Sequence, residues 1–412
     1  MLRAFHDGMS ARVTVGGHQS DPFDVLAGVK QGCVLAPVIF NLFLVAVTLV
    51  FRNGLPSNAG IPINFRLDGN LFNIRRLQAK NKVSSDTIFD LQYADDAAIP
   101  SHTAVGLQHS LDLLATTYQR AGLIVNTKKT EVLPQSVNTS SAAHPTFTVH
   151  GDSLNDVHQF TYLGSILTSD CDLNNEIQQR VKLASAAFGR LSHRVFLNCN
   201  LAIATKIAVY KAICISILLY GCESWTPYRR HIKTLEAFHI RCLKSILGIH
   251  WWHKVTHVEI RHRAAGIDSA EHLLLQRQLR WVGHVIRMPS NRLPRRVLYG
   301  ELVNGQRLPG GPKLRYMDHI RRILNKCNIS TAELEQLSTD RDTWKSACAN
   351  GLAIYNVSAD QAAEDRRTRR HNPANPPTTG PRCTQCNRIC ASEFGLRSHL
   401  RSHASRPHQQ HS

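Results

Sequence analysis

The spacing of apolar side chains divides the chain into a mixed first part and a helical second part. Residues 36–52 are apolar on every side of a helix axis, and Pro37 stands in the first turn, so they predict a buried helix. Residues 86–100 place apolar side chains on both sides of a polar turn, as a β-hairpin does. Residues 103–120 return to helical spacing and are followed by Gly122, a residue typical of helix ends. The first part should therefore combine an antiparallel sheet with helices.

From about residue 174 onward, the recurrence of apolar residues indicates long amphipathic helices. One stripe consists of Ile177, Val181, Ala184 and Phe188, and another of Leu235, Phe238, Cys242 and Ile246. The longest apolar runs, residues 38–51 and 212–220, are shorter than the roughly 18 residues of a membrane span. With neither a span nor a signal peptide recognised, we expect no membrane partner and an intracellular location, with the nucleus favoured.

Positive charge is concentrated in two stretches of the chain, whose net charge is +19. Residues 226–325 hold 19 Lys and Arg against 6 Asp and Glu, and residues 361–412 hold 9 against 3. Residues 1–225 are nearly balanced, with 18 against 16. A positive field confined in this way favours a polyanionic partner, most simply RNA or DNA. The alternative is a basic surface that is merely solvated.

Four residues near the C-terminus have the spacing of a ββα zinc finger: Cys383, Cys386, His399 and His403. Two cysteines on a turn and two histidines one helical turn apart provide a closed tetrahedral site with two sulfur and two nitrogen ligands. This pattern predicts Zn²⁺ as a cofactor that supplies most of the folding energy of the finger.

The helix of this finger is poorly suited to reading bases. The positions that usually face base edges hold Ser392, Gly395 and Ser398, which cannot make the bidentate contacts of Arg, Asn or Gln. Three arginines are instead placed to contact phosphates: Arg388, Arg397 and Arg401. We therefore predict that the finger binds the nucleic acid backbone.

Two adjacent carboxylates, Asp95 and Asp96, lie at the turn of the hairpin predicted over residues 86–100. Two ionised carboxylates side by side repel each other unless they are solvated or bound to a cation. Mg²⁺ is commonly held by one or two carboxylates together with substrate phosphates, which suits phosphoryl-transfer chemistry on nucleotides. A solvated Asp-Asp turn explains these residues equally well when they are taken alone.

Four segments, in this order, resemble the motifs of LINE-like (non-LTR) retrotransposon reverse transcriptases. They are residues 28–37 (Gly-Val-Lys-Gln-Gly-Cys-Val-Leu-Ala-Pro), 91–96 (Leu-Gln-Tyr-Ala-Asp-Asp), 122–131 (Gly-Leu-Ile-Val-Asn-Thr-Lys-Lys-Thr-Glu) and 160–165 (Phe-Thr-Tyr-Leu-Gly-Ser). The resemblance extends from about Met1 to Leu324. It implies an α+β fold in which a partial reverse-transcriptase palm, an antiparallel sheet with helices, precedes a helical thumb.

For catalysis, the resemblance implies that Asp95, with Asp96 beside it, binds Mg²⁺ in the palm. Lys129 would stand near the triphosphate as a proton donor or as a neutralising charge. The family takes a further metal-binding aspartate from a strand that precedes residues 28–37. None of the acids before residue 28 is a credible replacement for it, so we expect that the two-metal site lacks a bridging ligand.

The resemblance also implies two places of contact with nucleic acid. Template or incoming nucleotide would be contacted by Gln31, Gly32 and Tyr93. The primer end would be held by Leu163 and Gly164. Nucleoside triphosphates would be the only small-molecule substrates of an active form.

These observations predict five segments. They are a truncated palm at 1–168, a helical thumb at 169–225, a basic helical nucleic-acid-binding region at 226–358, a disordered linker at 359–381 and the zinc finger at 382–405. We predict a truncated RNA-directed DNA polymerase that binds nucleic acid and zinc but does not polymerise alone. Two alternatives stay open: an active polymerase completed by upstream sequence, and a host-adopted C2H2 zinc-finger protein that binds nucleic acid.

Overall fold

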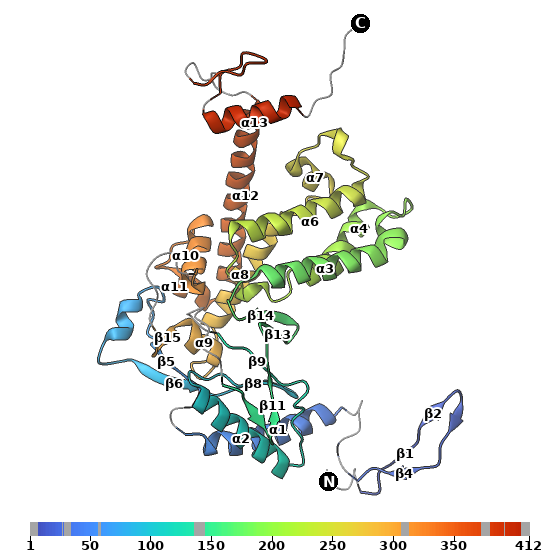
Figure 1. The fold of residues 1–412 in the computed structure, drawn as a ribbon, viewed down its shortest axis with the longest axis vertical. Helices are drawn as coiled ribbons and strands as arrows, with labels where there is room; N and C mark the ends of the chain where they lie inside the picture. The colour runs from blue at the N-terminus through green and yellow to red at the C-terminus, as the bar shows by residue number, and fades with distance from the viewer. Residues whose placement is uncertain are drawn as a thin grey trace.

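The computed structural model describes residues 7–26, 28, 34–56, 59–135, 145–305, 313–371, 380–390 and 392–404. As expected, the fold combines helices and strands. A first part with small sheets and the helices α1 and α2 is followed by a larger helical part, a long helix that leads away from it, and a small C-terminal unit (Figure 1).

Short strands lie near the N-terminus. β1 (Ser10–Ala11) pairs with β4 (Phe23–Asp24), and β2 (Thr14–Val15) pairs with β3 (His18–Gln19), all of them antiparallel. Figure 1 shows these strands projecting sideways from the lower end of the molecule. Their residues are largely exposed and belong to neither hydrophobic core.

Helices α1 (Ala36–Gly54) and α2 (Ala104–Arg120) form close to where their sequences predict. The hydroxyl of Thr103 accepts the Gly106 N–H at 3.1 Å and so caps the first turn of α2. Beyond the last turn, Gly122 has a φ of 75°, a conformation that favours glycine and ends the helix. The two helices pack against each other.

The prediction that residues 36–52 form a buried helix is wrong in one respect. The helix is present, but only 22% of its apolar stretch is buried, because α2 covers one side of it in the described part of the chain. Its exposed side chains include Val38, Leu42, Val45 and Leu49. The helix also extends beyond the apolar run at 38–51. With 19 residues and a mean hydropathy of 1.7 it has the length and composition of a membrane span, two criteria that core helices of soluble proteins also meet.

The sheets of the first part are small. The antiparallel pairs are β5 (Ile61–Phe65) with β6 (Ser84–Ile88), β7 (Leu91–Tyr93) with β8 (Asp96–Ala98), β10 (Thr148–Val149) with β11 (Asp152–Ser153), and β13 (Gln159–Tyr162) with β14 (Ser165–Thr168). A parallel pair joins β9 (Glu131–Val132) to β12 (Asn155–Asp156). The single antiparallel sheet that we predicted is therefore divided. A small core lies against α2, made by Leu111, Ala115, Val132, Phe147, Val149 and Leu154.

A strand from the helical part completes the three-stranded sheet. β15 (Gly300–Leu302) pairs antiparallel with β5, and Gly300 lies opposite Phe65. A Cβ atom at Gly300 would lie 2.7 Å from the Arg296 carbonyl oxygen and 2.9 Å from that of Asn64, so glycine is required at this close approach. Backbone pairing therefore joins the first part to the helical part.

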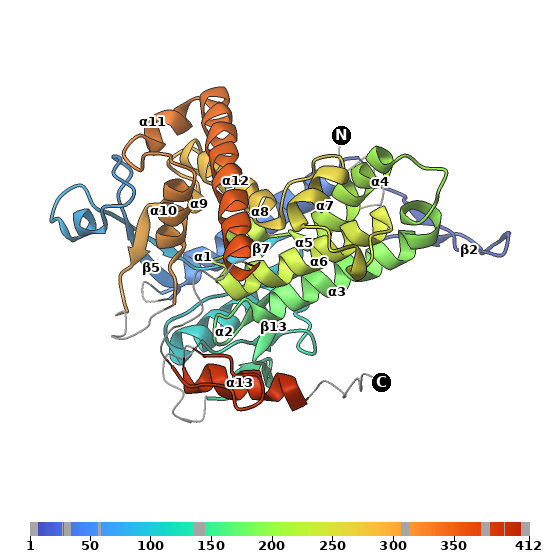
Figure 2. The same ribbon diagram turned by 90° about the horizontal axis from the view of Figure 1, so that it is seen from above.

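The helical part consists of α3 (Asn174–Leu191), α4 (Ile203–Tyr210), α5 (Ser216–Leu218), α6 (Arg229–Leu247), α7 (His257–Arg263), α8 (Ala270–Ile286), α9 (Leu293–Leu298), α10 (Tyr316–Lys326), α11 (Leu334–Thr339) and α12 (Arg341–His371). Shorter turns are η2 (Ile74–Gln78), η3 (Ser192–Phe196), η4 (Lys211–Ile215), η5 (Cys222–Ser224) and η6 (Trp251–His253). Figure 2 shows α3 and α6 side by side, and α12 against α8.

One hydrophobic core extends through these helices. It contains residues from both predicted segments, such as Ile177 and Leu218 on one side of the predicted boundary and Leu235 and Leu274 on the other. The boundary predicted between residues 225 and 226 therefore does not separate two domains. The segments predicted as a thumb and as a basic region share this one core.

The prediction of a disordered linker over residues 359–381 is wrong for its first half. Residues 359–371 continue α12 as its last turns. Their sequence is polar, but Ala, Gln, Glu and Arg are good helix formers, and the Gln361 amide donates to Asp365 one turn later at 3.0 Å. Residues 372–379 lie outside the described residues.

Two buried histidines in the helical core are held in the neutral form. The Gln278 amide nitrogen donates to the carbonyls of Cys222 and Trp225 at 2.9 and 2.8 Å. Its oxygen therefore faces His319 Nε2, 3.0 Å away, which must carry the proton and donate it. Burial lowers the pKa of His319 to about 4, and burial also lowers the pKa of His239 to about 4.

Lowering the pH from 7 to 4.5 is expected to destabilise the fold by up to about 3 kcal/mol for each of His239 and His319. Each pKa lies below the ordinary value of 6.5, so the unfolded chain binds more protons between these two values. Stability that is present above pH 6.5 is therefore lost as the pH falls toward 4. Urea unfolding at both pH values measures the change.

The control for this pH dependence is His319→Gln. The glutamine amide nitrogen reaches the position of Nε2 and can donate to Gln278, but it does not titrate. This variant should show a smaller loss of stability on acidification than the wild-type chain. The same loss in both proteins would mean that His319 does not contribute to the pH dependence.

Candidate functional site

The two adjacent carboxylates lie on a tight hairpin. β7 ends at Tyr93 and β8 begins at Asp96, so that Ala94 and Asp95 form a two-residue turn. Ala94 has a φ of 52°, the left-handed geometry that two-residue hairpin turns use. Tyr93, Asp95 and Asp96 are all exposed. The hairpin therefore presents both carboxylates to solvent, where a cation can reach them.

Helix α1 holds the strand that leads into this hairpin. Arg52 donates from Nε and Nη2 to the two oxygens of buried Asp90 at 2.7 and 2.8 Å. These hydrogen bonds raise the pKa of Arg52. Thr48, one turn earlier and on the same face of α1, donates its hydroxyl to Gln92 Oε1 at 2.6 Å. The helix that follows the Gly-Val-Lys-Gln-Gly segment is thus attached to the strand before the carboxylates.

The turn predicted as a primer grip is a second two-residue hairpin turn. Leu163 and Gly164 join β13 to β14 and have φ values of 48° and 79°. Two consecutive left-handed residues define the type I′ turn, which matches the twist of paired strands. The second of them is the residue for which this geometry is unstrained, because glycine has no Cβ.

Tyr162 connects the two hairpins. Its hydroxyl donates to the Leu91 carbonyl, at the start of β7, at 2.8 Å. Burial raises the pKa of Tyr162, and the charges of Asp96 and Asp90 raise it further, so the phenol stays protonated and able to donate. The structure therefore brings the predicted primer-grip hairpin against the hairpin that carries the carboxylates.

A buried ion pair on α3 supports the turn at Leu163 and Gly164. Glu176 accepts the Arg180 Nε–H at 2.7 Å and the Ile166 N–H at 2.7 Å. Arg180 also donates from Nη2 to the Gly164 carbonyl. The side chains of Glu176 and Arg180 are only 1% and 6% exposed. Such a pair is stable only when its remaining donors and acceptors are satisfied, and here two backbone groups of the hairpin satisfy them.

Tyr220 also contacts this turn. Its ring lies 4.7 Å from the Arg180 guanidinium, and its hydroxyl donates to the Leu163 carbonyl at 2.9 Å. None of the four sequence motifs includes Glu176, Arg180 or Tyr220. The available signal was an acid and a base one turn apart, close to the apolar stripe of α3.

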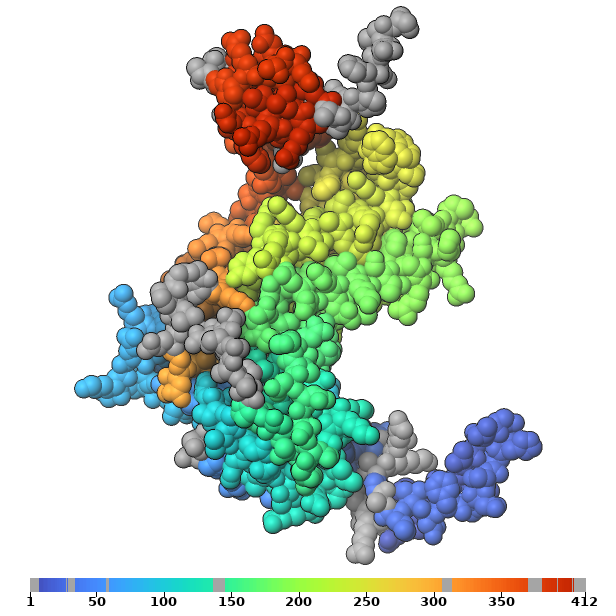
Figure 3. All heavy atoms as spheres, in the orientation of Figure 1, coloured from blue at the N-terminus to red at the C-terminus, as the bar shows by residue number. Residues whose placement is uncertain are grey.

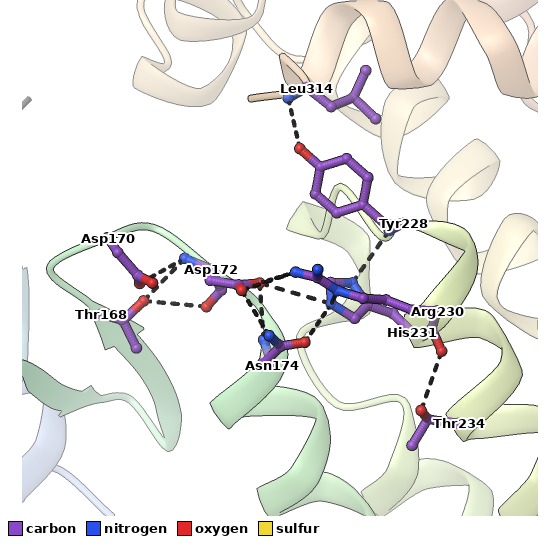
Figure 4. Close-up of polar contacts among 9 residues, drawn as sticks. All are labelled: Thr168, Asp170, Asp172, Asn174, Tyr228, Arg230, His231, Thr234 and Leu314. Carbon is purple, nitrogen blue, oxygen red and sulfur yellow. Dashed lines mark hydrogen bonds and ion pairs between the residues drawn. The ribbon is translucent and has the colours of Figure 1, made fainter. Parts of the chain in front are cut away.

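Polar contacts in the segment after β14 join the β13–β14 hairpin to the N-terminal end of α6 (Figure 4). Asp172 accepts hydrogen bonds from Arg230 Nη2 at 2.9 Å and from the Asn174 amide at 2.7 Å. His231 Nδ1 accepts the Tyr228 N–H at 3.2 Å, which leaves Nε2 to donate to Asn174 Oδ1 at 2.8 Å. Burial lowers the pKa of His231, in agreement with a neutral ring.

The segment just before α10 lies beside this junction. The Leu314 N–H donates to the Tyr228 hydroxyl at 3.2 Å (Figure 4). A hydrogen bond from the Thr168 hydroxyl lowers the pKa of Asp170, and the charge of Lys313 lowers it further. Residues 306–312 lie outside the described residues. The positive charge of Lys313 therefore acts close to the end of β14.

The other residues predicted for the palm are Gln31, Gly32 and Lys129. Gln31 and Gly32 lie outside the described residues. Lys129 is exposed in a turn after α2, where its backbone N–H donates to the Asn126 carbonyl at 3.0 Å. Within the described ranges, no third acid or histidine joins Asp95 and Asp96 in a group able to hold a metal ion.

The C-terminal cysteines and histidines form a cluster that could hold a metal ion. All four ligand atoms lie within 4.8 Å of one another: Cys383 Sγ, Cys386 Sγ, His399 Nε2 and His403 Nε2. Sulfur-to-nitrogen distances are 3.0 and 3.6 Å, and the two nitrogens are 3.1 Å apart. A tetrahedral zinc ion with ordinary bond lengths requires separations of roughly 3.3–3.8 Å, so the residues fit the ion after small adjustments.

The surrounding backbone has the predicted ββα arrangement. Arg382 and Ile389 form an antiparallel bridge that holds the cysteine turn, and α13 (Glu393–Ala404) carries both histidines on one face. The three arginines predicted to contact phosphates are exposed: Arg388, Arg397 and Arg401.

One side of the molecule is concave. Figure 3 shows a concave side between the arm formed by α3 and α4 above and the N-terminal strands below. α3 packs on β14, so the hairpin with the Leu163–Gly164 turn lies at the base of this arm.

Comparisons with known proteins identify a family for the first part and relatives for a longer portion of the chain. Residues 4–167 match the family of reverse transcriptases (RNA-dependent DNA polymerases). The chain is 23% identical over 269 residues to an uncharacterised transposon-derived protein of Caenorhabditis elegans, a match that covers 64% of this chain and 96% of that protein.

Two further relatives are RNA-directed DNA polymerases of the mobile element jockey. They come from Drosophila melanogaster and Drosophila funebris and are 20% and 21% identical to this chain. Each match covers 63% of this chain but 26% of the polymerase. The chain therefore spans about a quarter of the length of these polymerases. Its similarity to a mobile-element reverse transcriptase agrees with the family predicted from the four motifs.

Proposed function

We propose that this chain, whose residues 4–167 match the reverse transcriptase family, binds a primed nucleic acid template across its two hairpins. The contact that carries the proposal is the hydrogen bond from Tyr162 to the Leu91 carbonyl. Through it, the turn at Leu163 and Gly164 is held against the hairpin of Asp95. A primer end resting on that turn would lie beside the carboxylates.

The residues of the first hairpin suit a divalent metal bound together with phosphates. Asp95 at the turn would hold Mg²⁺, with Asp96 beside it, and the ion would neutralise phosphate charge when bound. Tyr93 would contact the nucleotide or template. Lys129 would add positive charge near a triphosphate, as a point charge on a flexible stem.

We further propose that the chain binds primed template without extending it unaided. In the described residues, Asp95 and Asp96 have no third ligand close enough to complete a metal site. Two-metal phosphoryl transfer needs ligands that hold both ions about 3.5–4 Å apart. The proposal thus combines reverse-transcriptase ancestry with binding but not with independent polymerase activity.

No primer extension above background is expected from the purified chain with Mg²⁺, a primed RNA template and nucleoside triphosphates. The matched control is Asp95→Ala, which removes the proposed metal ligand from an exposed turn and should leave the fold intact. Equal, background-level extension by both proteins is the expected result. Extension by the wild-type chain that Asp95→Ala abolishes would show that the site is complete and active.

A second candidate function is that of a zinc-finger protein that binds nucleic acid, and the cluster at residues 383–403 favours it. The two functions are compatible, because the finger follows the long helix α12 and could add a further contact with the nucleic acid backbone.

We also propose a nuclear location, which imaging of the tagged chain would test.

Binding of RNA or DNA is expected to weaken steeply with salt and to depend little on sequence. Each phosphate neutralised by Lys or Arg releases counterions, so the logarithm of the affinity falls linearly with the logarithm of salt concentration. Replacing both Arg397 and Arg401 with Gln should reduce that slope by about two, or one per lost phosphate contact. Fluorescence anisotropy at several salt concentrations gives the slope.

The matched control is Lys345→Gln, an exposed cation on α12 in the slightly acidic segment 326–360. It should leave the slope unchanged. If replacing Arg397 and Arg401 changed the salt slope no more than Lys345→Gln does, the finger would not be part of the binding surface. A footprint confined to one sequence would contradict the proposal that the backbone is recognised.

A further inference from the structure

Two adjacent tryptophans are exposed at the tip of the basic helical part. Trp251 is 81% exposed and Trp252 is 55% exposed, in the turn η6 between α6 and α7. Tryptophan is highly buried on average in folded proteins, and exposed aromatic side chains are typical of binding surfaces. This turn follows the C-terminal end of α6, whereas the junction with β14 lies at the other end of that helix (Figure 1).

The backbone of this turn is anchored to the core before and after the two tryptophans. Ile249 before the tryptophans and Val255 after them both pack against the helical core. Gly248, directly after α6, has a φ of 64°, and Lys254, directly after η6, has a φ of 50°. The chain is thus anchored on both sides, and the residues between the anchors, the two tryptophans among them, are exposed. Their exposure is a property of the folded conformation.

The two indoles have different surroundings. Trp252 stacks on the His250 ring, with centroids 4.3 Å apart and planes within 2° of parallel. Trp251 stands nearly perpendicular to Trp252, at 83° and 5.9 Å. One face of Trp252 is therefore covered, whereas Trp251 meets its neighbour edge to face and keeps most of its surface in solvent. Trp252 and His250 orient Trp251.

The charge around the tryptophans is positive. Residues 241–263 hold five Lys and Arg against one acid, Glu259. Two of the arginines pair with Asp360 and Glu259. The other three cations form no ion pair with any residue that the structure describes: Arg241, Lys244 and Lys254. Burial lowers the pKa of His257, and the charges of Lys244 and Arg261 lower it further, which reflects the same positive field.

We propose that Trp251 stacks on an unpaired base of single-stranded nucleic acid, while Lys244 and Lys254 contact the flanking phosphates. Aromatic faces combined with a positively charged track are the means by which proteins bind single strands without reading their sequence. In a duplex the bases are already stacked on one another, so a single strand is the form that offers a face to Trp251. The inference rests on the proposed binding of nucleic acid and adds a specific contact to it.

The test compares Trp251 variants of the full chain on a single-stranded oligonucleotide and on a blunt duplex of the same sequence, by fluorescence anisotropy. Trp251→Ala should weaken binding of the single strand about tenfold, the usual effect of losing one base-aromatic stack, and leave duplex binding nearly unchanged. Trp251→Phe should retain most of the affinity. Trp251→Leu, which is apolar but has no aromatic face, should behave like the alanine variant.

Further variants of the full chain test the proposed phosphate contact of Lys254 and control for effects on folding. Lys254→Gln should reduce the salt slope by about one, whereas Trp251→Ala should leave the slope unchanged. Val357→Ala, at an exposed apolar position on α12, serves as the control and should bind like the wild-type chain. Because Trp251 is exposed, its variants should unfold at the wild-type temperature.

The inference and the proposed function fail in different ways. If the wild-type chain bound neither single strand nor duplex, the proposed function would be wrong. If it bound both, and Trp251→Ala matched the wild type on the single strand, the stacking site would be wrong while nucleic acid binding stood. Equal affinities for Trp251→Leu and Trp251→Phe would likewise overturn base stacking, because apolar area alone would then explain the contact.

Discussion

A peptide of residues 380–404 is expected to be unfolded without metal and to form the helix α13 when one equivalent of Zn²⁺ is added. The finger has little hydrophobic core of its own: Cys383 and Cys390 are buried, but Phe394 on the helix is 83% exposed. Metal binding by such a site has an apparent free energy of about 10–16 kcal/mol and is coupled to folding. Circular dichroism should show helix formation on zinc addition and its loss on chelation.

Ligand substitution provides the control for the zinc prediction. His399→Ala should behave like the chelated peptide, whereas Ser398→Ala, at an exposed neighbour on the same helix, should fold with zinc as the wild type does. In the full chain, chelation should leave unfolding of the helical part unchanged, because its core lies within residues 71–355. A stable helix in the metal-free peptide would contradict the prediction.

Replacing Glu176 with Ala is expected to lower the free energy of unfolding by about 3–5 kcal/mol, the usual result of breaking a buried ion pair. Arg180 would remain buried without its partner, and the Ile166 N–H would lose its acceptor. The turn at Leu163 and Gly164 would also lose its support from α3, so binding of primed template should weaken. Urea denaturation measures the free energy of unfolding, and fluorescence anisotropy measures binding of the primed template.

The chain contains a matched pair for comparison. Glu259 and Arg263 have the same spacing of four residues on a helix and a 2.6 Å contact, but their side chains are 45% and 53% exposed. Glu259→Ala should cost about 0.5 kcal/mol or less, because solvent screens an exposed pair. Similar losses for Glu176→Ala and Glu259→Ala would show that burial does not determine the strength of the pair on α3.

Local features of the fold could be predicted because nearby residues determine them. Thr103 caps α2 through its own side chain, and the spacing of the C-terminal cysteines and histidines places four ligands on one turn and one helix face. The hairpin around Asp95 follows from a polar turn between apolar strands. Each of these signals lies within about 20 residues of sequence.

Contacts between distant segments could not be predicted in this way. The Arg52–Asp90 pair and the bond from Tyr162 to the Leu91 carbonyl join residues 38 and 71 positions apart, and no local pattern marks them. The exposure of α1 was missed because apolar composition shows what a helix can bury and does not show which neighbours cover it. The continuation of α12 departs from the prediction because polar residues that are good helix formers can extend a helix without burying apolar surface.

The pairing of β15 with β5 has a consequence for synthesis of the chain on the ribosome. Phe65 is translated roughly 235 residues before its partner Gly300, which at 5–20 residues per second is a delay of roughly 10–50 s. During that time one edge of β5 lacks its native neighbour. Its unpaired backbone N–H and C=O groups can then pair with another chain and promote aggregation. A nascent chain stalled before residue 300 should therefore depend on chaperones more than one stalled after residue 371, when α12 has been made and β15 has left the ribosome.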